Sequence, residues 1–133
     1  MTASAAVILA FGIIHLLYTF HGPKLTPRDT ALRQRMQEVS PVITSETTIW
    51  KTWIGVNATH SLALILFGLI YGYLALSKSE VLFNSPFLLL VGLGMLLALA
   101  VICRLYFFSI PFRGICFALV CYIAGVALSR WKM

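Results

Sequence analysis

Acidic side chains and paired cysteines are scarce in this chain. Its 133 residues include only four Asp and Glu, against ten Lys and Arg. No Glu-x-x-His pair occurs, so a carboxylate-bridged two-metal site is not expected. The three cysteines, Cys103, Cys116 and Cys121, fall in apolar stretches and form no Cys-x-x-Cys motif. This pattern argues against a thiol oxidoreductase and predicts three free, buried thiols that pack as small hydrophobic groups.

Signatures of common soluble enzymes are also missing. No Ser lies in a Gly-x-Ser-x-Gly elbow, and no glycine-rich phosphate loop occurs. The net charge of +6 is not gathered in a continuous basic patch, so nucleic-acid binding is not expected. Basic residues that flank membrane spans account for the same charge, because they meet anionic lipid head groups.

Hydrophobic residues, by contrast, make up 60% of the chain. The mean hydropathy is +0.94. A soluble domain of this length cannot hide so much apolar surface in one core. Four apolar runs each approach or exceed the about 20 residues that cross a bilayer as a helix. They predict membrane spans at about residues 3–21, 47–76, 86–108 and 112–130.

The polar stretch between the first two spans predicts a short helix of its own. Thr26-Pro27-Arg28-Asp29 has the composition of a helix start, with Thr26 as the N-cap. The helix would cover about residues 27–39 and stop before Ser40-Pro41. Its apolar residues share one side, which is typical of an amphipathic helix on a membrane surface. These residues are Leu25, Leu32, Met36 and Val39.

Further signals mark turns and helix packing. Thr44-Ser45-Glu46 predicts the cap that opens the second span, and Ile110-Pro111 predicts a tight turn between the last two spans. Gly68 and Gly72 are four residues apart, a spacing that lets transmembrane backbones approach closely. The sequence therefore predicts an all-α fold. It would be a single transmembrane domain: an integral membrane four-helix bundle with a short amphipathic interfacial helix between spans one and two.

The basic residues predict the orientation of the spans. Seven of them belong to the first connection, the start of the second span and the third connection: Lys24, Arg28, Arg33, Arg35, Lys51, Arg104 and Arg113. Three belong to the opposite side: Lys78, Arg130 and Lys132. The positive-inside rule then places connections one and three in the cytoplasm and both termini outside.

Three ionisable residues fall inside the predicted spans: His15, His60 and Arg104. Such a group costs a few kcal/mol within a bilayer, so it needs a partner or a function. All three lie toward the predicted cytoplasmic side, where they could converge on one cavity. The structural alternatives are a hydrogen bond from each His to a neighbouring helix and an Arg104 that reaches the head groups. The candidate ligand-binding residues are His15, Tyr18, Trp53, Asn57, His60 and Arg104.

Several segments carry a resemblance. They are HLLYTFHGPKLTPRD at 15–29, TTIWKTWIGVNATHSL at 47–62, FGLIYGYLA at 67–75, RLYFF at 104–108 and PFRG at 111–114. Together they resemble a family of small bacterial four-helix inner-membrane proteins. The resemblance implies an architecture and a location in the inner membrane, and it supplies no reaction. Size and layout are also similar to DoxX-like proteins and to the sterol-isomerase-like membrane fold, without a shared catalytic motif.

Three functions remain open at this point. The first is binding, with or without conversion, of a lipophilic small molecule between the helices, near the cytoplasmic leaflet. A His could then move a proton near neutral pH. The second is a haem-b protein with His15 and His60 as axial ligands across the bundle. The third is a non-catalytic accessory subunit that packs on a partner membrane protein or a second copy. Two His alone do not make a closed zinc site, and no cofactor is specified.

Overall fold

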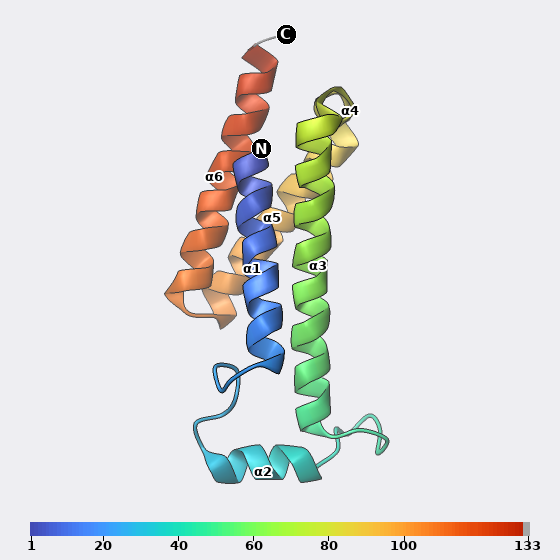
Figure 1. Ribbon diagram of the computed structural model, residues 1–133, viewed down its shortest axis with the longest axis vertical. Coiled ribbons are helices and arrows are strands. Elements are labelled where there is room, and N and C mark those ends of the chain that lie inside the picture. The colour runs from blue at the N-terminus through green and yellow to red at the C-terminus, as the bar shows by residue number, and fades with distance from the viewer. Residues whose placement is uncertain (132–133) are drawn as a thin grey trace. The chain divides into compact units, whose positions relative to one another are not determined.

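The computed structural model describes residues 1–131. These residues form six helices and no strand, which confirms the all-α prediction for this part of the chain (Figure 1). The helices are α1 (Thr2–Phe20), α2 (Thr30–Glu38), α3 (Ile49–Ser77), α4 (Ser79–Asn84), α5 (Pro86–Tyr106) and α6 (Ser109–Trp131). Four of them, α1, α3, α5 and α6, are long and apolar enough to cross a membrane. Lys132, which entered the orientation prediction, lies outside the described residues.

The four long helices leave most of their apolar surface uncovered. Only 17% to 28% of the most apolar window of each helix is buried within the protein. Each helix contributes large exposed side chains, such as Leu17, Leu66, Leu90 and Val120. Apolar surface of this extent is unfavourable in water and favourable against lipid chains.

The chain divides into two compact units. One consists of Met1–Ala10 and Leu64–Met133, and the other of Phe11–Ala63. The first unit therefore holds the start of α1, the second half of α3, and α4 to α6. The second unit holds the end of α1, α2 and the first half of α3, and it contains His15, Asn57 and His60.

In the unit of Met1–Ala10 and Leu64–Met133, α1 meets α3 at a glycine. A Cβ atom placed on Gly68 would lie 2.7 Å from Leu9 Cβ and 2.9 Å from the Ala5 carbonyl oxygen. Real Cβ atoms do not approach other atoms so closely, so only glycine permits this contact. The close backbone approach predicted from the glycine spacing is confirmed at this position.

Two tyrosines attach α5 to its neighbours in the same unit. The Tyr71 hydroxyl of α3 donates to the Leu88 carbonyl at 2.7 Å, and the Tyr122 hydroxyl of α6 donates to the Leu89 carbonyl at 2.9 Å. Both rings press on Gly92, where an added Cβ would overlap the Tyr122 hydroxyl. A hydroxyl in apolar surroundings needs such an acceptor, because no water is there to replace it.

The start of α2 differs from the sequence prediction. Asp29, and not Thr26, is the N-cap: its Oδ1 accepts from the backbone N–H groups of Ala31 at 2.8 Å and Leu32 at 3.3 Å. The Thr26 hydroxyl instead donates to the Pro23 carbonyl at 2.7 Å. The carboxylate satisfies two free N–H groups and also matches the positive end of the helix dipole, which explains why it takes the cap position.

The start of α3 was also predicted wrongly. Thr48 caps the helix, since its hydroxyl oxygen accepts from the backbone N–H of Lys51 at 3.3 Å. Thr44 accepts from the N–H of Glu46 at 3.1 Å and so forms a local turn of its own. Thr and Ser make both kinds of bond with equal ease, and the sequence alone did not separate them.

The connection between α5 and α6 lies earlier than predicted. The turn falls at Phe107 and Phe108, and Pro111 is inside the first turn of α6 instead of in the connection. Proline is tolerated there because the first N–H groups of a helix have no intrahelical partner. The short helix α4 was not predicted either.

The close packing at Gly68 can be tested by paired substitutions. We expect Gly68→Ala to lower the free energy of unfolding by about 1–3 kcal/mol, because the added methyl group has no space. Gly94→Ala is the matched control, since a Cβ on Gly94 of α5 meets nothing within 4 Å. The measurement is denaturation of the purified protein in detergent, followed by circular dichroism. Equal effects of the two substitutions would contradict this packing.

Candidate functional site

Three of the predicted site residues come together in the unit of Phe11–Ala63. His15 comes from the end of α1, and Asn57 and His60 come from the first half of α3. His15 Nε2 lies 3.0 Å from Asn57 Oδ1. The rings of His15 and His60 meet edge to face, with centroids 5.4 Å apart and planes at 86°. We call these three residues the His–Asn–His cluster.

Asn57 determines which nitrogen of His15 carries the proton. The Asn57 Nδ2 group donates to the Trp53 carbonyl at 2.8 Å. An amide nitrogen only donates and an amide oxygen only accepts, so Oδ1 is the atom that faces His15. His15 Nε2 must then be the donor in the 3.0 Å bond. In the neutral ring this leaves His15 Nδ1 as a hydrogen-bond acceptor.

The hydroxyl groups near the cluster are already used by the helices. Thr19 donates to the His15 carbonyl at 2.8 Å, and Ser61 donates to the Asn57 carbonyl at 2.8 Å. Thr59 donates to the carbonyls of Gly55 and Val56, at 3.0 Å each. These are bonds within one helix, one turn back along the chain. Thr59 and Ser61 therefore add no free donor beside His60.

His60 differs from His15 in having no such partner. Among residues 1–131, its ring nitrogens make no hydrogen bond, and its ring contact is with His15. The cluster thus contains one fixed ring and one free ring. Its unused groups are Nδ1 of His15 and both ring nitrogens of His60, that is, acceptors and one donor in the neutral state.

Tyr18 and Trp53 belong to the same unit but have other partners. The Trp53 indole N–H donates to the Leu25 carbonyl at 2.9 Å and so ties the segment after α1 to α3. The Tyr18 hydroxyl accepts from Lys24 Nζ at 3.1 Å, and the same ammonium group lies 4.3 Å from the centre of the Tyr18 ring. Their polar atoms therefore hold the connection, and only their rings remain for a ligand.

Arg104 is in the other unit, on the last turn of α5. Its guanidinium carbon lies 5.8 Å from the centre of the Phe112 ring. Its convergence with His15 and His60 stays a prediction, because the two units are each described separately.

The arrangement of the cluster does not fit a bis-histidine haem. An axial His binds iron through a nitrogen lone pair, and the His15 Nε2 position is occupied by the proton donated to Asn57. The two rings are also in direct contact, with centroids 5.4 Å apart, which leaves no space for a porphyrin between them. Haem binding between the two histidines would have to separate the rings, and ligation through Nε2 of His15 would also have to break its bond to Asn57. In the described part of the chain, no three His, Cys, Asp or Glu residues are grouped to hold a metal ion.

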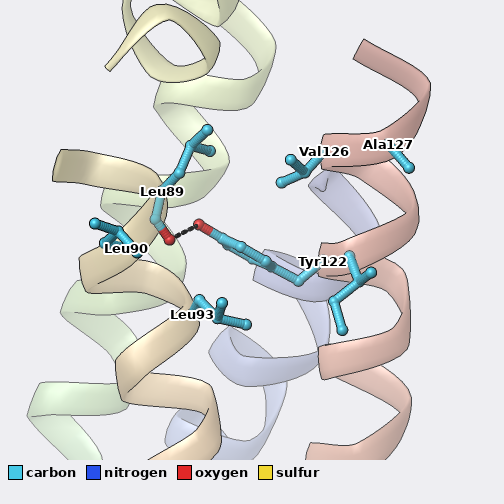
Figure 2. A pocket seen from close by; sticks show the side chains of 7 residues that line it. Leu89, Leu90, Leu93, Tyr122, Val126 and Ala127 are labelled. Carbon is cyan, nitrogen blue, oxygen red and sulfur yellow. Dashed lines mark hydrogen bonds between the residues drawn. The ribbon is translucent and has the colours of Figure 1, made fainter. Parts of the chain in front are cut away.

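Sequence reasoning missed a groove between α5 and α6, with a volume of about 290 Å³ (Figure 2). Tyr122 projects into it, but its hydroxyl is bound to the Leu89 carbonyl, as the dashed line in Figure 2 shows. No other polar side chain lines the groove, so it offers no acid, base or nucleophile. It is lined by Leu89, Leu90, Leu93, Tyr122, Ile123, Val126 and Ala127. Leucine and valine have the same sequence pattern whether they face lipid or line a groove, so the sequence contains no signal for this groove.

Comparison with known proteins adds no relative. No family model matches the chain, and neither the curated proteins nor the solved structures contain a match.

The assignment of the His15 proton leads to a spectroscopic prediction. We expect the neutral imidazole of His15 to carry its proton on Nε2. Asn57→Leu should remove this preference for the Nε2 tautomer, because the acceptor oxygen is lost. The imidazole ¹⁵N chemical shifts of the two proteins in detergent would show it. His60 serves as the internal control, since its ring has no bond to Asn57. Protonation of His15 on Nδ1 in the unsubstituted protein would show that Asn57 does not orient the ring.

Proposed function

We propose that this chain is a multi-pass membrane protein that binds a lipophilic small molecule through the His–Asn–His cluster. The observation that carries the proposal is the pair of rings in contact, one fixed by Asn57 and the other with free nitrogens, on helices that are otherwise apolar. Within a bilayer, ionisable side chains face an internal partner or a ligand, because lipid supplies no hydrogen bonds.

Membrane insertion is supported by length and surface. Helix α3 has 29 residues, which at 1.5 Å per residue is about 43 Å. A hydrocarbon core is about 30 Å thick, so α3 extends into a head-group region. Lys51 and Trp53, near its start, are residue types that favour this region. The basic connections α1–α3 and α5–α6 then face the cytoplasm, and the resemblance implies the bacterial inner membrane.

The segment between α1 and α3 lies on the membrane surface in this proposal. A backbone bond from Ile49 N–H to the Val39 carbonyl, 2.8 Å long, closes the loop after α2. Val42 and Ile43 are in this loop, and both are exposed. Exposed aliphatic side chains are typical of interfacial segments, where they insert below the head groups.

The free groups of the cluster determine what part of a ligand it can hold. His15 Nδ1 accepts a hydrogen bond, and neutral His60 has one donor and one acceptor. This set matches a hydroxyl or carbonyl group on an apolar body, such as a sterol-like or isoprenoid alcohol. A carboxylate or phosphate head group would find no permanent positive charge in the cluster. An imidazole can also accept a proton on one nitrogen and give one up from the other, as a proton-transfer reaction such as double-bond isomerisation requires.

An accessory subunit is the competing proposal, and the glycines argue against it. Two of the glycines that could pack on a partner are already covered by the chain itself, which leaves less small-residue surface for a partner. Leu9 and Ala5 occupy the space over Gly68, and Tyr122 occupies the space over Gly92.

The proposal is tested by native mass spectrometry of the protein extracted gently from its own membrane. We expect an added mass in the range of a lipophilic alcohol or ketone. His60→Ala should lower its occupancy about tenfold for either ligand, and His15→Ala should do so for an alcohol, which donates to Nδ1 of His15, because a buried hydrogen bond contributes about 1 kcal/mol and its unpaired partner costs more.

His21→Ala is the matched control, because His21 is exposed and lies outside the cluster. It should keep the added mass. A mass that survives in the His15→Ala/His60→Ala variant would place the ligand elsewhere. A protein found bare, or only with another polypeptide, would favour the accessory subunit.

A further inference from the structure

Arg104 has no acidic partner within its own unit. The unit of Met1–Ala10 and Leu64–Met133 contains a single acidic residue, Glu80. Glu80 belongs to α4, before the start of α5, whereas Arg104 lies on the last turn of α5. Helix α5 has 21 residues and is about 31 Å long, so the two charges lie near opposite ends of this helix.

The guanidinium group of Arg104 borders a second apolar groove, of about 280 Å³. Ala100, Val101, Arg104 and Leu105 form one face of α5, and Phe112 closes the groove from the first turn of α6. The Phe112 ring, 5.8 Å from the guanidinium carbon, holds the cation at the groove without using its N–H groups. Among the described residues, the Arg104 side chain makes no hydrogen bond or ion pair.

We propose that this groove binds one anionic phospholipid, with the lipid phosphate on Arg104 and an acyl chain along the Ala100–Leu105 face. Arginine donates two parallel hydrogen bonds to phosphate, which is the strong form of this interaction. The direction also fits. Arg104 is near the end of α5, and Ala100 lies one turn deeper in the span, about 6 Å along the axis.

The charge pattern selects an anionic lipid over a zwitterionic one. No Asp or Glu occurs after Glu80, so no carboxylate side chain of α5 or α6 can pair with the ammonium group of a choline or ethanolamine head. An anionic lipid brings negative charge to a groove whose one charged lining residue is Arg104. The groove shares no residue with the His–Asn–His cluster, and the lipid proposal does not depend on the function proposed for that cluster.

The experiment compares two lipids with identical acyl chains, phosphatidylglycerol and phosphatidylcholine, added to the delipidated protein in detergent. Native mass spectrometry measures the bound fraction of each. We expect phosphatidylglycerol to bind at least about tenfold more tightly, and Arg104→Gln to reduce its affinity about tenfold. Arg113→Gln is the matched control: it removes the same charge from the same connection, but Arg113 does not line the groove. Its effect should stay below about twofold.

Two further arms make the test decisive. Ala100→Phe fills the groove and keeps Arg104, so it should also lose the lipid. Millimolar inorganic phosphate should not displace the lipid, because it has no acyl chain to occupy the groove. The proposal is overturned by equal binding of the two lipids, by equal effects of the two arginine substitutions, by an unaltered affinity in Ala100→Phe, or by displacement with phosphate. If Arg104→Gln does not fold, Arg104→Lys and Ala100→Phe decide it.

Discussion

Polar groups that the helices shield from solvent have to find their partners within the chain, and this requirement fixes several of the helix contacts. The four long helices are apolar over most of their surface, and that surface is left open to the surroundings. Four hydroxyl groups with little exposure to solvent bond to backbone carbonyls: Thr19 and Ser61 to their own helices, and Tyr71 and Tyr122 to α5. The two tyrosine bonds have a structural consequence, because they fix α5 between α3 and α6 and require a glycine at position 92.

A few polar groups have no hydrogen-bond partner within the described chain, and they differ in chemistry. The Ser4 hydroxyl is buried without a hydrogen-bond partner in the described structure. A hydroxyl cannot take up a proton at neutral pH, so this exception is a modest local cost. Two further exceptions are the ring nitrogens of His60 and the guanidinium group of Arg104. These groups are ionisable, and leaving them unpaired in an apolar region costs more than leaving a hydroxyl unpaired. It is this difference that makes His60 and Arg104 candidates for ligand contacts.

The sequence predicted the elements better than their ends. A long, mostly apolar run predicts a helix that can cross a membrane, whatever its neighbours, and the structure has four such helices. Helix caps depend on which of several similar side chains bonds to the free backbone N–H groups. Asp29 caps α2 where Thr26 was predicted, and Thr48 caps α3 where Thr44 was predicted, because one or two hydrogen bonds decide each case. The contact between His15 and Asn57 was only partly predictable. Helical spacing placed Asn57 and His60 on one face, but the match in height between α1 and α3 depends on tertiary packing.

The two histidines looked alike in the sequence, and the structure makes them different. The bond from Asn57 Nδ2 to the Trp53 carbonyl orients the Asn57 amide so that its Oδ1 faces His15. The bond from His15 to Oδ1 then makes Nε2 the donor and Nδ1 the acceptor of that ring before any ligand binds. His60 has no such constraint and can present either tautomer. A ligand hydroxyl can donate to Nδ1 of His15, and this contact depends on Asn57. A ligand carbonyl can only accept, and within the cluster only His60 can donate to it, since the single N–H of neutral His15 is already bound. Binding of an alcohol should therefore depend on Asn57, and binding of a ketone should not. The identity of the three side chains alone does not make this distinction.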